Sequence, residues 1–399
     1  MKILNQQIMK NNNLKKVFSL IMEHEPISRI ELAAMTSLSK TTISSLVEDL
    51  INGGFVVDDG SADTGKQGRK PNFLRVNKEG NVVAVINWHI DDLELSLVDM
   101  SGQVVNYEMV PVDNNTEYEK VIPEAYYEKL VPRAAGRFIL GFCLVVPSML
   151  DAETNMMIST VLPVEDHDDV LGRICKKFTD VPVAVFNDTA CYAYAEHVLT
   201  NWKFDTFMFL NINNGVGAVF VHDGKMIKGA SGMRAQIGHF SIHRDGKKCT
   251  CGNRGCLENE VGETALVERA REEGLYEKLE VDGRITFASL GNQAKNGDET
   301  AKLFIRELAE DMAYALSNMA VVDYTKHIII GGKGQRLGEY YLEELDKAFK
   351  QRGFQLFISQ MDLKYTALGD DAIMRGAARY YIDVFYKFFE DMSHFIVME

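Results

Sequence analysis

The segment 234–258 constrains the fold more than any other part of the chain, because it gathers three of the six cysteines. The cysteines follow the spacing C-x-C-x4-C at Cys249, Cys251 and Cys256. Gly252 and Gly255 lie among them, and the free φ of glycine allows a tight loop to turn several sulfur atoms toward one centre. This spacing is typical of a tetrahedral metal site with thiolate ligands.

A tetrahedral zinc ion needs a fourth nitrogen or sulfur ligand. His239 is the first candidate for that position and His243 is the second. With four protein ligands the site is closed, so the expected cofactor is a structural Zn²⁺. The alternative is three buried or disulfide-linked cysteines, but the charged neighbours Lys247, Lys248 and Arg254 disfavour a core.

The same segment resembles the zinc-bearing signature of the ROK family, whose repressors and sugar kinases share an actin-like, sugar-binding body. The matching residues read A-Q-I-G-H and C-x-C-G-x2-G-C-L-E. The resemblance extends over nearly the whole chain and includes an N-terminal helix-turn-helix, which marks the repressor branch and is absent from the kinases. It implies an α/β fold, with a winged helix-turn-helix followed by a two-lobed, actin-like (ribonuclease H-like) body.

Length and composition agree with several domains, since 399 residues with 46% hydrophobic side chains can fill more than one core. We expect a winged helix-turn-helix in residues 1–76, a first lobe in 77–200 completed by a C-terminal helix 372–399, and a second lobe with the zinc site in 201–371. The chain has no apolar run near the roughly 18–20 residues of a membrane span and no signal-peptide core. We therefore expect a cytoplasmic protein without membrane contact.

The net charge of −14 is unevenly distributed along the chain. Residues 1–76 carry ten Lys and Arg against eight Asp and Glu, whereas the remainder carries 33 against 49. Only the N-terminal end can therefore approach the phosphates of nucleic acid without strong repulsion.

Three short helices are predicted at this end. The first has one apolar face, formed at i, i+3, i+4 and i+7 by Leu14, Val17, Phe18 and Ile21. The second opens on Ser28 with Glu31 as a capping-box partner, and the third runs from near Ser39 to Gly53. The third helix presents small hydroxyls and one cation outward: Ser39, Lys40, Thr41, Thr42, Ser44 and Ser45. This face fits a major groove, although a plain three-helix bundle with a solvated face remains the alternative.

A hairpin follows the helices. Residues 55–57 and 73–76 alternate like paired strands, and the loop between them carries Lys66, Arg69 and Lys70 around a glycine. Basic residues beside a flexible glycine suit contact with a phosphate backbone or a minor groove. Together with the helices this is a winged helix that resembles the N-terminus of ROK repressors, so we expect a double-stranded DNA operator as partner.

The first hairpin of the body departs from the kinases of the family. The kinases carry there an aspartate and glycines that wrap the phosphates of ATP, whereas this chain has Asn87, Trp88 and His89. An amide and bulky side chains do not allow the close backbone approach that phosphates need. We therefore expect no catalytic residues and no enzymatic activity.

The strand 182–186 ends at Asn187 and Asp188, where open α/β sheets place their ligands. An amide and a carboxylate suit the hydroxyls of a polyol, although a helix cap is an alternative role and both can coexist. In ROK kinases the equivalent of Asp188 is the base that deprotonates the sugar. The resemblance adds His239, Glu258 and Gln236 as sugar contacts, with glutamine at 236 where the family has glutamate.

The sequence as a whole predicts a transcriptional repressor of carbohydrate-related genes that binds DNA and is controlled by a small sugar between its lobes. Two alternatives stay open: an ATP-dependent sugar kinase with a DNA-binding module, and a ROK-type regulator controlled by a protein partner. Because readers of this kind pair two half-sites, we expect a homodimer or a homotetramer.

Overall fold

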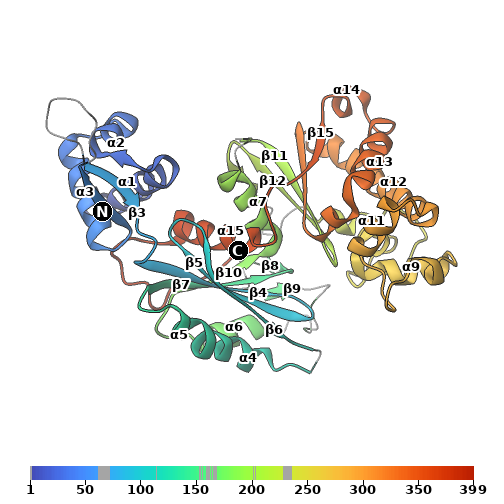
Figure 1. Cartoon of the computed structure of the whole chain (residues 1–399), viewed down its shortest axis with the longest axis horizontal. Coiled ribbons are helices and arrows are strands. Elements are labelled where there is room, and N and C mark those ends of the chain that lie inside the picture. The colour runs from blue at the N-terminus through green and yellow to red at the C-terminus, as the bar shows by residue number, and fades with distance from the viewer. Residues whose placement is uncertain are drawn as a thin grey trace. The chain divides into compact units, whose positions relative to one another are not determined.

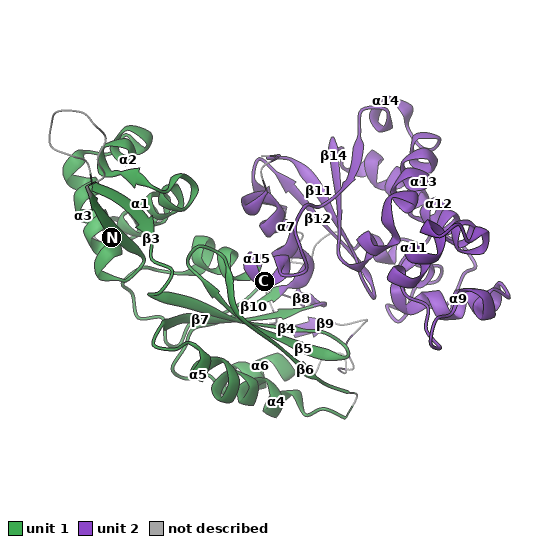
Figure 2. Cartoon of the chain, viewed as in Figure 1, with its two compact units in different colours: residues 1–146, 169–186, 377–398 green, residues 147–168, 187–376, 399 purple. Residues whose placement is uncertain are grey.

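The computed structural model describes residues 2–61, 72–113, 115–151, 154, 156–158, 162, 164, 169–200, 202, 204–227 and 236–399. They form two compact units (Figure 2). Unit 1 comprises residues 1–146, 169–186 and 377–398, and unit 2 comprises residues 147–168, 187–376 and 399. The N-terminal helices thus belong to the same unit as the first sheet of the body, and the three-domain division expected from the sequence stays a prediction.

The N-terminal part of unit 1 is a winged helix, as predicted. Its helices and strands are α1 (Lys2–His24), β1 (Ile27–Ser28), α2 (Arg29–Thr36), α3 (Lys40–Asn52), β2 (Val56–Ser61) and β3 (Asn72–Val76). The strands form one sheet in the order β1-β3-β2. The predicted capping box is present, since the Ser28 side chain accepts from the backbone of Glu31 and Glu31 accepts from the backbone of Ser28.

The body of unit 1 contains a six-stranded sheet in the order β16-β10-β7-β4-β5-β6. Its strands are β4 (Asn81–Trp88), β5 (Asp92–Asp99), β6 (Val104–Pro111), β7 (Phe138–Val146), β10 (Val183–Asn187) and β16 (Ile396–Met398). The first three strands are antiparallel neighbours, and β7 runs parallel to β4. Strands β4 and β7 are almost entirely buried because helices cover both faces.

One face of this sheet is covered by α4 (Tyr118–Glu124), a π-helical turn (Ala125–Leu130), α5 (Val131–Arg133) and α6 (Val170–Cys175). Helix α15 (Ala372–Tyr380) lies on the opposite face (Figure 1). The prediction of a single helix over residues 372–399 is wrong. Helix α15 passes into a π-helical turn (Tyr381–Phe385), and β16 then pairs with β10. The backbone groups of the last residues are satisfied by the sheet instead of by a helix.

Unit 2 is built on a second sheet in the order β13-β12-β11-β14-β15. Its strands are β11 (Phe207–Ile212), β12 (Val216–His222), β13 (Lys225–Met226), β14 (His327–Gly331) and β15 (Asp362–Tyr365). As in unit 1, antiparallel strands at one end are followed by parallel ones. A separate pair consists of β8 (Met149–Asp151) and β9 (Met156–Ile158).

Helices cover both faces of the second sheet (Figure 1). Helix α7 (Asp188–Leu199) lies on one face, where Tyr192 packs on Phe209 with ring centroids 4.7 Å apart. The other face packs on α11 (Phe287–Lys295), α12 (Glu299–Val322) and α13 (Gly338–Lys350). The remaining short helices are Ile237–His239, α8 (Glu258–Val261), Glu263–Ala265, α9 (Leu266–Glu272), α10 (Tyr276–Leu279), Lys333–Leu337 and α14 (Gln355–Ile358). Among the helices that the structure describes, none combines the length and apolar character needed to cross a bilayer.

Within unit 1 the C-terminal segment packs against the winged helix. The Phe388 ring lies 4.8 Å from that of Phe55 and 6.1 Å from that of Phe18. Lys15 Nζ donates to the Val384 carbonyl at 2.8 Å, and the Phe388 amide donates to Asn11 Oδ1 at 2.8 Å. We name these contacts the C-terminal seam.

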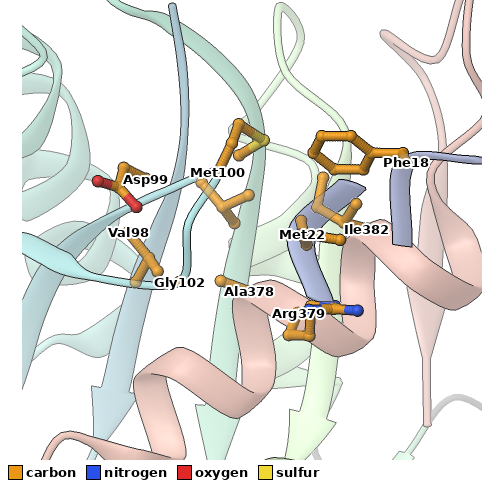
Figure 3. Close-up of a pocket in the computed structure, with 10 residues that line it drawn as sticks. Phe18, Met22, Val98, Asp99, Met100, Gly102, Ala378, Arg379 and Ile382 are labelled. Atoms are coloured by element: carbon orange, nitrogen blue, oxygen red, sulfur yellow. The ribbon is translucent and has the colours of Figure 1, made fainter. Parts of the chain in front are cut away.

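A small pocket beside the C-terminal seam is lined by α1, β4, β5, the β5–β6 turn, α15 and the π-helical turn after α15 (Figure 3). Its lining includes Phe18, Val98, Met100, Ala378 and Ile382. Its volume of about 20 Å³ is enough for one water molecule and too small for a sugar.

Candidate functional site

The outward face of α3 combines exposed polar residues with a buried apolar face. Ile43, Leu46, Val47 and Leu50 pack inward with at most 3% of their surface exposed. Lys40, Thr41, Ser44 and Ser45 are exposed. The structure therefore presents a short polar helix surface of the kind that a DNA groove accepts.

Three of the predicted DNA-contacting residues have a local structural role. The Ser39 side chain caps α3 by accepting from the Thr42 amide at 3.1 Å. The Ser39 hydroxyl also lies 2.8 Å from the Thr42 hydroxyl and 2.8 Å from the Thr41 hydroxyl. Ser39, Thr41 and Thr42 thus share hydrogen bonds at the start of the helix, whereas Lys40, Ser44 and Ser45 face outward beyond this cap. Lys66, Arg69 and Lys70 lie outside the described residues.

The wing strands are tied to the helices by ion pairs. Arg29, at the start of α2, donates to Asp58 at 2.8 Å and to Glu48 at 3.1 Å. Arg75 on β3 pairs with Asp59 on β2 at 2.5 Å. The Arg29–Asp58 pair therefore fixes β2 on α2, whereas the other two pairs join α2 to α3 and β2 to β3. The sequence analysis did not predict these contacts.

The predicted metal ligands converge in unit 2. One atom from each of His239, Cys249, Cys251 and Cys256 lies within 4.8 Å of the others. His239 Nδ1 is 3.8 Å from Cys249 Sγ, and the sulfur atoms of Cys251 and Cys256 are 3.7 Å apart. His243, the reserve candidate, belongs to a different group with Glu260 and Asp311.

These distances fit a tetrahedral metal ion. Ligands at about 2.3 Å from a tetrahedral centre are separated by about 3.8 Å, and sulfur atoms joined in a disulfide by about 2.05 Å. All three cysteines are free thiols. Burial and the two neighbouring thiols raise the pKa of Cys256, and a bound cation favours its thiolate form.

Local backbone geometry fixes the position of His239 beside strand β12. A Cβ on Gly238 would lie 2.4 Å from the Val216 carbonyl oxygen, so only glycine allows the Ile237–His239 turn to approach β12 this closely. On the same strand, the Val216 amide donates to Glu258 Oε2 at 3.0 Å. His239 and Glu258 are thus held against the start of one strand, and Gln236 directly precedes the turn.

A second polar group lies at the start of α7. Asn187 caps the helix, since its side chain accepts from the Ala190 amide at 3.0 Å. Asp188 is 8% exposed and accepts from the Thr189 amide at 2.6 Å and from Asn211 Nδ2 at 3.3 Å. The capping role that the sequence left open is therefore occupied by Asn187, and donors surround the carboxylate of Asp188.

Asn211 is a further candidate site residue, which the sequence analysis did not name. It is 2% exposed, at the carboxyl end of the apolar strand β11, and contacts Asp188, Thr189 and Asn213. A buried amide in a run of apolar residues was the signal that could have found it. Because Asn211 lies next to the end of β11 and Val216 begins β12, one hairpin contacts both Asp188 and Glu258.

The end of the first hairpin in unit 1 carries its own polar network. Asn87 Nδ2 donates to Glu94 Oε2 at 2.9 Å, His89 Nε2 lies 3.0 Å from the same oxygen, and Tyr107 donates to Glu94 Oε1 at 3.0 Å. Burial disfavours the charged acid, but the hydrogen bonds from His89, Asn87 and Tyr107 outweigh it and lower the pKa of Glu94. Trp88 points elsewhere: it is fully buried and packs on Tyr118, with ring centroids 4.3 Å apart.

Two family models match this chain, and proteins of known role are similar to it over most of its length. Residues 85–384 match the ROK family, and residues 10–57 match a winged helix-turn-helix DNA-binding domain. The chain is 29% identical to the xylose repressor of Caldicellulosiruptor bescii over 384 residues, which cover 93% of this chain and 96% of that protein. It is 24% identical to the xylose repressor of Bacillus subtilis, with 96% and 98% covered.

Solved structures show the same fold. A ROK family transcriptional regulator described as a homologue of the E. coli Mlc protein superposes with a TM-score of 0.78, at 23% identity and over 94% of this chain and 97% of that one. A ROK family glucokinase from Streptomyces griseus, in complex with glucose and AMPPNP, superposes with a TM-score of 0.64 at 21% identity and covers 75% of this chain and 98% of its own. The kinase leaves a quarter of this chain unmatched, whereas the regulator spans almost all of it. The chain therefore belongs to the ROK family and carries an N-terminal winged helix-turn-helix on the family's actin-like α/β body.

Proposed function

We propose that this protein is a sequence-specific DNA-binding transcriptional repressor of carbohydrate-related genes, controlled by a small sugar. The observation that carries the proposal is the presence, in one chain, of a winged helix with an exposed polar α3 and a complete ROK body. Relatives that match over nearly the full length are named xylose repressors. The protein acts where the DNA is, in the cytoplasm, as a homodimer or homotetramer whose paired winged helices contact two half-sites.

DNA is contacted by α3 and by the wing. Lys40 supplies charge to a phosphate, while the hydroxyls of Thr41, Ser44 and Ser45 reach base edges or phosphates. Ser39 and Thr42 position the first turn of the helix. Their hydroxyl groups donate to DNA only where the hydrogen is not already used in a bond within the cap. Lys66, Arg69 and Lys70 add phosphate or minor-groove contacts from the wing.

The Cys/His group holds a structural zinc ion through His239, Cys249, Cys251 and Cys256. The support is the tetrahedral spacing of the four donor atoms. When bound, zinc neutralises the clustered thiolates and fixes the loop that leads into α8. His239 uses Nδ1 toward the cysteines, which leaves its Nε2 to donate to a ligand.

The sugar is bound by Asn187, Asp188, Gln236, His239 and Glu258. These side chains offer two carboxylates, two amides and an imidazole, a mixture of acceptors and donors that suits neighbouring hydroxyls. Gln236 contributes no charge, which favours a neutral monosaccharide over a cationic one. Xylose is the first compound to test because of the names of the relatives.

Sugar binding is transmitted to the winged helix along α15 and the C-terminal seam. The chain passes from unit 2 into unit 1 within α15 and then contacts α1 through Val384 and Phe388. A change in the first half of α15 therefore has a covalent route to the DNA-binding helices. Coupling of about 1–3 kcal/mol is enough for this control.

The rival function is an ATP-dependent sugar kinase with a DNA-binding module. Against it stands the network of Asn87, His89, Glu94 and Tyr107, which occupies the end of the first hairpin with side chains and leaves no glycine for close phosphate approach. A regulator controlled by a protein partner is the third candidate, and a thermal-shift screen tests it: a rise in melting temperature with a sugar would count against this candidate.

The experiment has two steps. A high-affinity DNA site is selected from random duplexes with the full-length protein, and binding to it is followed by fluorescence anisotropy while xylose, glucose, sugar acids and sugar phosphates are added. The proposal expects tight, sequence-dependent binding that one neutral sugar weakens by about 5- to 150-fold. Sequence-independent binding, or sugar-dependent ATP turnover in a coupled assay, would refute the proposed role.

A further inference from the structure

A second group of metal-type ligands lies near the Cys/His group. It consists of His243 on the loop, Glu260 on α8 and Asp311 on α12, and one donor atom of each lies within 4.8 Å of the others. His243 Nε2 is 3.6 Å from Asp311 Oδ1. The sequence analysis named His243 only as a second candidate for the thiolate site, and it gave no role to Glu260 or Asp311.

The backbone fixes the position of His243. Gly255, at φ 65°, passes so close that a Cβ there would lie 1.8 Å from the His243 carbonyl oxygen. The Ile242 amide also donates to the Gly255 carbonyl at 2.8 Å. The loop therefore carries His243 in a set position opposite α12, with half of its side chain exposed to solvent.

Glu260 is a buried carboxylate without a partner of its own. It is 9% exposed, and among the residues that the structure describes its side chain has no hydrogen bond and no ion pair within 4.0 Å. Burial raises the pKa of Glu260 in spite of the nearby charges of Arg269, His243 and Lys247. A charge buried in this way needs either a proton or a cation.

The two neighbouring basic side chains are already paired with other acids. Arg269 contacts Glu273 at 2.9 Å and Asp311 Oδ2 at 2.6 Å, and Lys247 contacts Glu272 at 2.9 Å. Because Arg269 takes Oδ2, the other oxygen of Asp311 remains directed at His243. Glu307 also lies 3.7 Å from Arg269, so the positive charge of Arg269 is shared among three acids outside Glu260.

We propose that His243, Glu260 and Asp311 bind a first-row divalent metal ion of the Mn²⁺ or Zn²⁺ type, separately from the thiolate group. One imidazole nitrogen and two carboxylate oxygens are a common ligand set for such ions, and water fills the open positions on the exposed side of His243. The ion ties the loop and α8 to α12. This proposal does not depend on which effector or which DNA the protein binds.

Mn²⁺ is the probe because carboxylate and imidazole ligands accept it, whereas a thiolate group with zinc in place does not exchange for it. Full-length protein that retains its zinc is titrated with Mn²⁺, and free Mn²⁺ is followed by electron paramagnetic resonance. The expected result is one saturable Mn²⁺ site per chain with zinc content unchanged. Glu260→Gln and His243→Gln should each weaken that site by at least about tenfold.

The matched controls are Glu272→Gln and Glu307→Gln, which remove neighbouring carboxylates outside the trio and should leave Mn²⁺ affinity within about threefold. Thermal unfolding gives a second readout that does not require tight binding. Without Mn²⁺, Glu260→Gln should equal or exceed the native chain in melting temperature, because it removes an unpaired buried charge. With Mn²⁺ the order should reverse.

The proposal fails if the native chain shows no saturable Mn²⁺ or Zn²⁺ binding beyond the thiolate group. It also fails if Glu260→Gln and His243→Gln bind Mn²⁺ as tightly as the controls do. His243 is half exposed, so His243→Gln keeps the test valid even if a change at Glu260 disturbs folding.

Discussion

Removing Phe388 tests whether the C-terminal seam holds the winged helix to the body of unit 1. The Phe388 side chain is 4% exposed and contacts the rings of Phe18, Phe55 and Tyr386 at 4.8–6.1 Å. Truncating a buried phenylalanine to alanine costs about 3–5 kcal/mol, which combines the lost transfer free energy with the cavity left behind. For a unit of this size each kcal/mol lowers the melting temperature by about 2–4 °C, so Phe388→Ala should lower it by roughly 6–20 °C.

Phe389→Ala is the matched control. Phe389 is the next residue, but 54% of its surface is exposed. Its truncation leaves no enclosed cavity, and the smaller buried area corresponds to about 1–2 kcal/mol. The two variants therefore change the same residue type in the same segment with different burial.

The fluorescence of Trp88 reports on unit 1 directly. The chain has two tryptophans, of which Trp88 lies buried in unit 1 and Trp202 lies in unit 2. Both variants are therefore made in a Trp202→Phe background and unfolded thermally. Equal losses of melting temperature in Phe388→Ala and Phe389→Ala would refute the assigned packing, and so would an unshifted Trp88 transition in Phe388→Ala.

Four further predictions concern the Cys/His group, the sugar site, the DNA-binding helix and the buried acid Glu196 on α7. Cys251→Ser should release zinc, measured by metal analysis, because serine is a poor zinc ligand, whereas Cys175→Ser should destabilise the chain without changing its metal content. Asp188→Asn should weaken sugar binding by about 1–3 kcal/mol in calorimetry, and unchanged affinity relative to Asp205→Asn would remove Asp188 from the site. Lys40→Ala should weaken DNA binding for all sequences and reduce the salt slope by about 1; an unaltered slope would exclude a phosphate contact, and Lys176→Ala serves as control. Burial raises the pKa of Glu196, so this carboxyl group binds a proton more tightly in the folded chain than in the unfolded chain. The folding stability that this protonation contributes is lost as pH rises through the pKa of the folded state. Glu196→Gln should therefore raise the melting temperature at neutral pH and have little effect near about pH 4; an equal gain at both pH values would contradict this reasoning.

The local elements of this protein were readable from its sequence because each depends on near neighbours. The capping box of Ser28 and Glu31, the apolar face of α3 and the spacing of Cys249, Cys251 and Cys256 all act over a few residues. The strand before Asn187 was likewise visible as a short apolar run. Such patterns fix which helix, turn or loop forms, whatever the chain does elsewhere.

The sequence determined the winged helix, the α/β body and the converging group of three cysteines and His239, since periodicity, caps and ligand spacing are properties of short segments. Only the tertiary structure decided which residues from distant segments meet: Phe388 with Phe55 in the C-terminal seam, and Glu260 with Asp311 beside His243. The end of the chain forms strand β16 where the sequence predicted a helix, because the free edge of β10 offers backbone partners that no local pattern encodes. Long-range pairing depends on what the rest of the fold leaves unsatisfied, and that is known only once the whole chain has packed.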